Sequence, residues 1–169
     1  DGADGADGDD GATGAQGIQG AAGADGAAGA AGAQGEFGGD SQSYTFNSSA
    51  VTDADPGANS LAYSNATPSL VTAIYADNLN SDGGGVTNWL DSLDANTTNP
   101  TRGRIRLFKE GDSSKFAVFD ITAAITNAST YRKLTVSYVA HYGTFANADA
   151  IVLSFALAGD KGAAGAAGS

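Results

Sequence analysis

Few residues of this 169-residue chain belong to the types that perform catalysis or hold a cofactor. Cysteine is absent, which excludes a thiolate nucleophile, a disulfide framework and a cysteine-ligated metal site. The only histidine, His141, is not part of a motif that supplies a nucleophile and an orienting acid. The run from Gly83 to Gly85 lacks the Lys-Ser/Thr pair that follows a phosphate-binding loop. We therefore expect neither an enzyme nor a bound cofactor or metal.

The aromatic side chains suit a different chemistry, the stacking of sugar rings. Trp89 is the candidate for such ligand stacking, and six tyrosines accompany it at positions 44, 63, 75, 131, 138 and 142. Large aromatic residues of a small β domain more often pack in its core. A glycan- or protein-binding surface is therefore the alternative to a purely structural role.

The chain is strongly acidic, and its charge is unevenly distributed. Its formal net charge is −11, and all eight basic residues lie between Arg102 and Lys161. An acidic chain repels nucleic acid phosphates and anionic lipid headgroups, so we expect no nucleic acid partner. No stretch of 18 apolar residues is present, so we also expect no membrane insertion.

Two clusters of like charge are open to two interpretations each. The acidic cluster either binds a divalent cation or is a solvated, repulsive stretch, and it lacks the ligand spacing of a calcium loop. The basic cluster either faces the acidic half of a neighbouring chain or consists of ordinary solvated strand faces. The acidic cluster is Asp4, Asp7, Asp9 and Asp10, and the basic cluster is Arg104, Arg106, Lys109, Arg132 and Lys133.

Glycine is spaced with a strict period of three in two parts of the chain, a first triplet run at 1–38 and a second triplet run at 159–169. This spacing is typical of the collagen triple helix, in which three polyproline II-like chains wind together and only glycine fits at the crowded axis. A flexible Gly/Ala linker has no reason to keep such a period. The predicted axial glycines are Gly2, Gly5, Gly8, Gly11, Gly14, Gly17, Gly20, Gly23, Gly26, Gly29, Gly32, Gly35, Gly38, Gly159, Gly162, Gly165 and Gly168.

Proline, which stabilises ordinary collagen, is absent from both triplet runs. Proline limits φ and so reduces the entropy that a chain loses on folding; without it, we expect the triple helix to be marginal. Asp160 and Lys161 occupy adjacent outer positions and are expected to form an ion pair between chains. The segment between the runs must supply the rest of the stability by trimerisation.

That segment has the alternation of apolar and polar residues that is typical of β-strands. Turn-forming sequences, such as the Asp-Pro-Gly at 55–57, separate the alternating stretches. The one helix that we expect spans 86–93, with Thr87 as its cap. Strands are expected at 43–46, 60–63, 70–76, 104–109, 116–125, 134–142 and 149–157.

Seven or eight short strands predict an all-β antiparallel sandwich with a jelly-roll-like arrangement. The alternation assigns two sets of side chains to inner faces, Leu134, Val136, Tyr138, Ala140 and Tyr142 from one strand and Ile151, Leu153, Phe155 and Leu157 from another. The predicted organisation is a collagen-like stalk at 1–38, a β trimerisation and spacer domain at 39–158, and the start of a second stalk at 159–169. Because the sequence begins within a triplet and without methionine, we expect it to be a piece of a longer chain.

Several motifs follow one another from the first triplet run to the second. They are Gly39-Asp40-Ser41, Asp55-Pro56-Gly57, Ala73-Ile74-Tyr75-Ala76-Asp77, Trp89-Leu90-Asp91-Ser92-Leu93-Asp94, Lys115-Phe116-Ala117-Val118-Phe119, Leu134-Thr135-Val136-Ser137-Tyr138, Leu153-Ser154-Phe155 and Gly159-Asp160-Lys161-Gly162. In this order of motifs the chain resembles the collagen-flanked β modules in fibre and minor structural proteins of tailed bacteriophages. The resemblance implies a homotrimeric external fibre of the virion, in contact with other virion proteins and serving host adsorption.

The sequence therefore favours a structural component of a trimeric phage fibre, in which the β domain trimerises the collagen-like rods and sets their register. Triplets without cysteine or proline suit assembly in a reducing bacterial cytoplasm that lacks prolyl hydroxylase. Two alternatives stay open. The β domain can itself bind a glycan or protein of the host surface, or the chain can belong to a collagen-like filament or adhesin of a bacterial cell surface.

Overall fold

The computed structural model describes residues 2, 5, 14–19, 41–50 and 52–159 of the chain. The chain divides into two units, Asp1–Gln34 and Gly35–Ser169. In the first unit, residues 14–19 form neither helix nor strand and are exposed to solvent. The second unit contains β1 (Ser41–Phe46), β2 (Ser60–Tyr63), the 3-10 helix η1 (Pro68–Leu70), β3 (Ala73–Asp77), α1 (Thr87–Ser92), β4 (Gly103–Lys109), β5 (Asp112–Ile121), β6 (Thr126–Asn127), β7 (Tyr131–Tyr142) and β8 (Ala150–Leu157).

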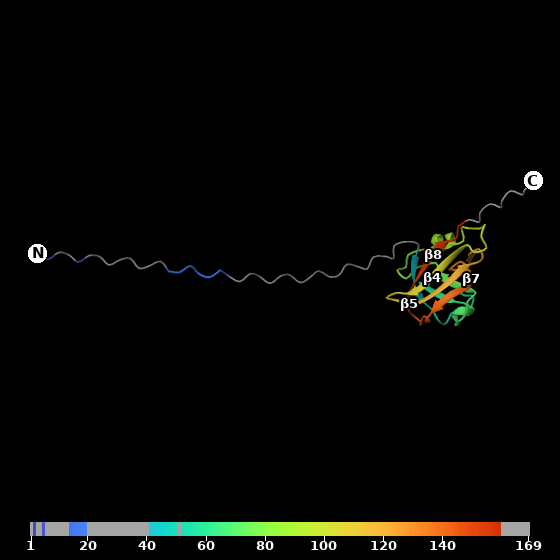
Figure 1. Ribbon diagram of the computed structural model, residues 1–169, viewed down its shortest axis with the longest axis horizontal. Helices are drawn as coiled ribbons and strands as arrows, with labels where there is room; N and C mark the ends of the chain where they lie inside the picture. Colours follow the sequence, from blue (N-terminus) through green and yellow to red (C-terminus); the bar gives the residue numbers. More distant parts are fainter. Residues whose placement is uncertain (1, 3–4, 6–13, 20–40, 51, 160–169) are drawn as a thin grey trace, which may run out of the picture. The chain divides into compact units, whose positions relative to one another are not determined.

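Seven of these strands form a closed barrel. Their order is β3-β2-β1-β8-β4-β5-β7, and β7 pairs back with β3 to close the ring. The parallel pair in the ring is β1 with β2, and the other neighbours are antiparallel. Figure 1 shows β8, β4, β5 and β7 side by side. Closure leaves these strands without free edges, which removes the usual route to unwanted pairing with other chains.

The structure confirms the predicted β module but has a barrel in place of the predicted two-sheet, jelly-roll-like sandwich. The difference lies in β7, which is twelve residues long. Its first part, 131–135, pairs with β3, whereas its second part, 136–142, pairs with β5. One long strand therefore joins what would otherwise be the two edges of the sheet. The predicted strand begins at residue 134, which is too late to reveal this double pairing.

Most of the other predicted elements lie where the alternation places them. The predicted strand at 60–63 coincides with β2, and 43–46, 104–109, 134–142 and all but the first residue of 149–157 lie within observed strands. Leu70, predicted to begin a strand, instead ends η1. The predicted helix is α1, but Thr87 is its first helical residue and not its cap. Val86 is the N-cap residue, and no side chain caps this helix.

One cluster of buried side chains fills the barrel, with contributions from all seven strands and from α1. Each fully buried aliphatic or aromatic side chain stabilises the fold by about 1.5–3 kcal/mol relative to an exposed one. The inward positions predicted for Leu134, Val136, Ile151 and Leu153 are confirmed. The largest fully buried side chains are Tyr44, Leu61, Ile74, Leu90, Leu93, Ile105, Leu107, Phe119, Ile121, Leu134, Ile151 and Leu153.

The alternation fails at the end of β7 because the strand contains a bulge. The pairing of β7 with β5 skips Val139, so the residues that follow change faces. Ala140 is only partly buried and the side chain of Tyr142 is 66% exposed, although both are predicted inward. Leu157, also predicted inward, is 54% exposed because it is the last residue of β8.

Gly103 of β4 leaves no room for a side chain. A Cβ atom at this position would overlap the ring of Phe155 and lie 2.9 Å from the carbonyl oxygen of Ala156. We expect Gly103→Ala to lower the free energy of unfolding by about 2 kcal/mol, because the strand and ring must move apart. Gly85→Ala is the matched control, since a Cβ there meets no atom within 4 Å. Equal stabilities of the two variants in urea denaturation would contradict this account.

Candidate functional site

The two ends of the barrel sequence, where the triplet runs join it, are the first feature with a bearing on function. The chain enters the barrel at Ser41, the first residue of β1, and leaves it after Leu157, the last residue of β8. β1 and β8 are antiparallel neighbours, and Ser41 pairs with Ser154. Gly159, the first glycine of the second run, therefore lies within about 20 Å of Ser41. Both junctions lie at one end of the barrel, which we call the junction end.

The exit from β8 is held by the loop that follows α1. The amide of Asn96 donates a hydrogen bond of 2.6 Å to the carbonyl oxygen of Ala158. The amide of Asn99 reaches the carbonyl oxygen of Gly159 at 3.4 Å, and the N–H of Ala158 donates to the carbonyl oxygen of Arg102 at 3.1 Å. Asn96 is 95% buried, so its side chain is fixed by the fold. These contacts fix the chain up to the first axial glycine of the second run.

The predicted axial glycines lie only partly within the described residues. Gly2, Gly5, Gly14, Gly17 and Gly159 are described, and the structure gives no Cβ contact within 4 Å for any of them. The other axial glycines, the acidic cluster at 4–10, and the predicted ion pair of Asp160 with Lys161 lie outside the described residues. The interchain ion pair and the triple helix therefore stay predictions.

The candidate catalytic and ligand-binding residues are spread over the barrel. His141 is exposed near the end of β7, and its Nδ1 lies 2.8 Å from the hydroxyl of Tyr138. The glycines at 83–85 form a turn whose N–H at Gly84 donates to the side chain of Asn80. Trp89 is partly buried on α1 and packs against the core cluster. Its proposed stacking on a sugar ring stays a prediction.

The predicted basic cluster does not act as one patch, because four of its members are paired with carboxylates of the same barrel. The reason is geometric: Arg104 faces Asp120 directly across β4 and β5, and the other pairs likewise join neighbouring elements. The four pairs are Arg104 with Asp120, Lys109 with Asp149, Arg132 with Asp91, and Lys133 with Asp53.

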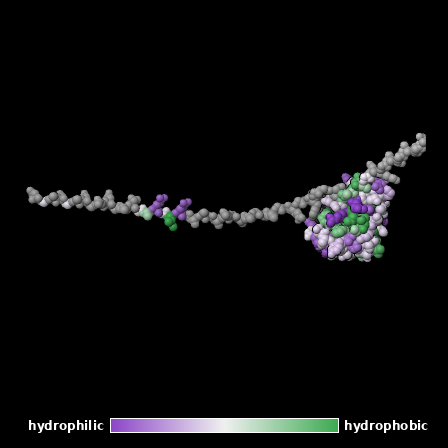
Figure 2. All heavy atoms as spheres, viewed as in Figure 1, coloured by the Kyte–Doolittle hydropathy of each residue, from purple (hydrophilic) through white to green (hydrophobic). Residues whose placement is uncertain are grey.

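The fifth member, Arg106, lies over two aromatic rings on the outer face of the barrel. Its guanidinium carbon is 5.3 Å from the ring centre of Phe108 and 5.1 Å from that of Phe116. Figure 2 shows hydrophobic and strongly hydrophilic side chains next to each other on the face that bears β4, β5, β7 and β8. Cation–π contacts of this kind stabilise the outer face without an acidic partner.

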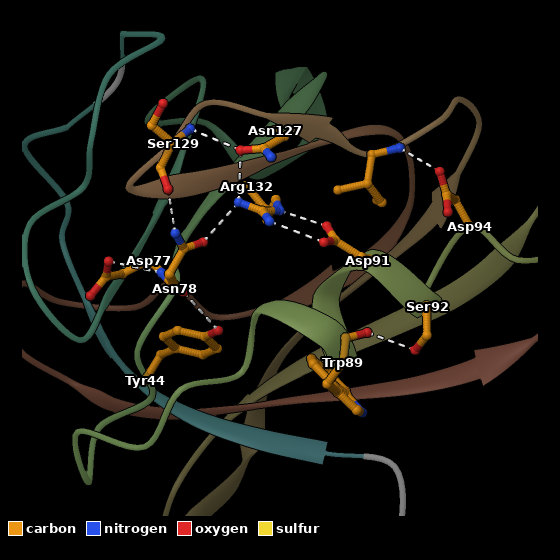
Figure 3. A network of polar contacts seen from close by, with 11 residues as sticks. Tyr44, Asp77, Asn78, Trp89, Asp91, Ser92, Asp94, Asn127, Ser129 and Arg132 are labelled. Carbon is orange, nitrogen blue, oxygen red and sulfur yellow. Dashed lines mark hydrogen bonds and ion pairs between the residues drawn. The ribbon is translucent and has the colours of Figure 1, made fainter.

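Arg132 is the centre of a polar network that anchors α1 to the barrel (Figure 3). Its side chain is only 4% exposed. It binds Asp91 of α1 with two hydrogen bonds, from Nε to Oδ1 at 2.5 Å and from Nη2 to Oδ2 at 3.0 Å. Nη1 donates to the amide oxygens of Asn78 at 3.1 Å and Asn127 at 3.0 Å. A buried guanidinium needs such a complete set of acceptors, since an unpaired buried charge is strongly destabilising.

The network shifts the protonation equilibria of its members. The hydrogen bonds from Arg132 lower the pKa of the Asp91 carboxyl, against a smaller opposing effect of burial. The same pairing raises the pKa of Arg132. The sequence contains a signal for this network. Arg132 lies two residues before Leu134 and four before Val136, both of which are buried, so the alternation along the strand assigns this charged residue to the inner face.

The residues that the structure describes include no helix with the length and hydrophobicity needed to cross a membrane. Within this part of the chain, no three His, Asp or Glu side chains come close enough together to hold a metal ion. Comparison with protein families, curated proteins and solved structures gives no match to the chain. Function is therefore inferred from the residues and their geometry.

Acid should weaken the anchor of α1. Because the pKa of Asp91 is lowered in the folded state, its ionised form stabilises the barrel above about pH 4, and this contribution is lost as the pH falls through the lowered value. We expect Asp91→Asn to cost about 1 kcal/mol at pH 7, a small value because the carboxylate is 47% exposed, and almost nothing near pH 2.

Urea denaturation at the two pH values measures this difference. Asp82→Asn is the control, because Asp82 is exposed and its carboxylate contacts no cation among the described side chains. A cost of Asp91→Asn that is the same at both pH values would contradict an electrostatic role of the pair.

Proposed function

We propose that this chain is a structural, non-enzymatic segment of a homotrimeric fibre, in which collagen-like rods carry a β-barrel module. The triplet runs of three copies wind together, and the barrel holds the three chains in register. The fibre belongs to the outside of a bacteriophage virion and serves adsorption to the host, as the resemblance of the motifs implies. Its partners are two copies of itself and other virion proteins.

The observation that carries this proposal is the strict three-residue period of glycine, which a single chain does not explain. At the described axial glycines an added Cβ would meet no atom within 4 Å, and none of them has a positive φ. A single chain therefore gains nothing from glycine at these positions. Ile18 between them is 99% exposed, although it is strongly apolar. A triple helix accounts for the period, because glycine is required only where three chains meet.

The position of the two junctions supports a role in register. Since β1 and β8 are hydrogen-bonded neighbours, the barrel holds Ser41, where the chain enters, at a fixed separation from Ala158, where it leaves. If three chains are in register in one run, the rigid pair of β1 and β8 then keeps them in register in the other run. With both junctions at one end, we further propose that each barrel is attached to the rods by that end.

Replacing one axial glycine should weaken trimerisation while leaving the barrel folded. We expect Gly17→Ala to lower the melting temperature of the trimer, because a methyl group at the axis separates the three chains. Gln16→Ala introduces the same residue at the neighbouring outer position and should have little effect. Sedimentation velocity gives the mass of the complex, and circular dichroism gives the melting temperature.

Two results would contradict the trimer. One is a monomeric mass for the unchanged chain at micromolar concentration. The other is equal melting behaviour of Gly17→Ala and Gln16→Ala, since only a triple helix distinguishes the axial from the outer position.

Electron microscopy of the purified source particle tests separately where the fibre is attached. Gold-labelled antibody against residues 40–158 should mark fibres attached to the phage tail. Label on filaments of the bacterial surface would keep the trimeric rod but replace the phage fibre by the alternative, a bacterial filament or adhesin.

A further inference from the structure

Tension along the chain reaches the barrel at two points that lie at the same end. The chain enters at Ser41 and leaves after Leu157, and the strands that carry these residues, β1 and β8, are antiparallel neighbours. The hydrogen bonds of an antiparallel pair run perpendicular to the strands. A pull that separates the two junctions therefore acts along these bonds, and it loads the residue pair nearest to the junctions first.

The opposite arrangement would resist a pull much better. If the chain entered and left the barrel at opposite ends, the pull would run along the strands and would load all five residue pairs between β1 and β8 at the same time. When pairs break one after another, each pair bears the whole load alone. The observed topology therefore opens under a force several times smaller than the same pairs would withstand together.

β1 is the more weakly held of the two terminal strands. It pairs with β8 from Ser41 to Thr45, whereas its pairing with β2 covers Thr45 and Phe46, at the end away from the junctions. Near the junction, the loop that follows β3 contacts β1 instead. The N–H of Ser81 in this loop donates a hydrogen bond of 2.8 Å to the carbonyl oxygen of Ser43, and the hydroxyls of the two residues lie 2.5 Å apart. Among the described residues, a loop and not a strand therefore holds this side of β1.

The first three residues of β1 also lie outside the hydrophobic core. They are Ser41, Gln42 and Ser43, which are polar and only partly buried. Tyr44 is the first side chain of β1 in the core cluster, and its hydroxyl donates a hydrogen bond of 3.1 Å to the carbonyl oxygen of Asp77. Three residue pairs therefore separate before a core side chain is exposed, and Tyr44 resists further opening.

β8, in contrast, is held by a long strand on the side away from β1. It pairs with β4 through seven residue pairs. Beyond its last residue, the carbonyl oxygen of Ala158 accepts a hydrogen bond from the buried Asn96. Tension at the exit therefore acts on β4 and on the loop after α1, and β1 is the strand that opens.

We propose that the barrel is a force-release module, in which tension between the two junctions peels β1 away from β8 one residue pair at a time while β8 stays bound to β4. Loss of β1 removes Tyr44 and Phe46 from the core and breaks the ring, so the rest of the barrel follows. The unravelled barrel sequence of more than a hundred residues spans about 400 Å, against about 20 Å between the folded junctions. The peeling is a property of one barrel, and only its use in a fibre, to limit the tension on the attachment points, rests on the proposed function.

Constant-force measurements on single full-length chains test the direction of opening. The chain contains no cysteine, so an introduced thiol is a unique attachment point. One tether holds the two chain ends and pulls the junctions apart. A second tether holds the N-terminal end and Ala146→Cys, an exposed position before β8 at the end of the barrel away from the junctions, so it pulls β1 lengthwise past β8. We expect the first tether to open the barrel at a force about threefold lower than the second.

The control for the attachment is Ala146→Cys with its thiol blocked, pulled by both chain ends. It should open at the same force as the unchanged chain. Equal forces for the two tethers would overturn the proposal, because the position of the junctions would then have no effect on opening.

A matched pair of substitutions tests which strand opens first. Ser81→Ala removes a hydroxyl contact of β1, whereas Asn99→Ala removes the contact with the carbonyl oxygen of Gly159 at the exit. We expect Ser81→Ala to shorten the lifetime of the folded barrel at constant force about fivefold, which is the effect of one hydrogen bond. Asn99→Ala should leave that lifetime unchanged.

The reverse result, a shorter lifetime for Asn99→Ala and an unchanged one for Ser81→Ala, would overturn the proposed order, since β8 would then open before β1. Tethered chains are measured one at a time, so neither result depends on trimerisation. A monomeric mass in sedimentation velocity would contradict the proposed fibre and leave the peeling of β1 unaffected.

Discussion

The pairing of β1 with β8 is the constraint on which the rest of the architecture depends. Five consecutive residue pairs, from Ser41 with Ser154 to Thr45 with Ala150, join the first strand to the last. This pairing brings the two ends of the barrel sequence together, although more than a hundred residues separate them. It places Ser41, where the chain enters the barrel, and Leu157, where the last strand ends, at the same end of the barrel. If the barrel lay in line between two rods, the chain would instead enter and leave it at opposite ends.

The two ends of the barrel differ in the contacts that they contain. At the junction end, the buried Asn96 and the network around Arg132 hold the exit of β8 and the helix α1, which suits a part of the molecule that transmits force and register. At the opposite end of the barrel, aromatic rings pack around Tyr63, whose buried hydroxyl has no hydrogen-bond partner among the described residues. The proposed fibre role uses the junction end, and it requires neither chemistry at His141 nor a bound metal.

Periodicity in the sequence predicts most of the strands and the inner positions of residues such as Leu134 and Ile151, because alternation reports directly which face is buried. It does not predict what depends on pairing between distant strands. The bulge at Val139 reverses the phase that puts Tyr142 inward, and the double pairing of β7 turns a sandwich into a barrel. Nor does periodicity predict the pocket lined by Phe46, Tyr63 and Phe145, because its lining residues come together only where β1, β2 and the loop after β7 meet.

Cryo-electron microscopy of the full chain tests the central proposal most directly. We expect a thin rod of three chains that carries three barrels, each attached by its junction end. A single chain without a rod would contradict the proposal. So would barrels that lie in line with the rod, with the chain entering at one end of the barrel and leaving at the other.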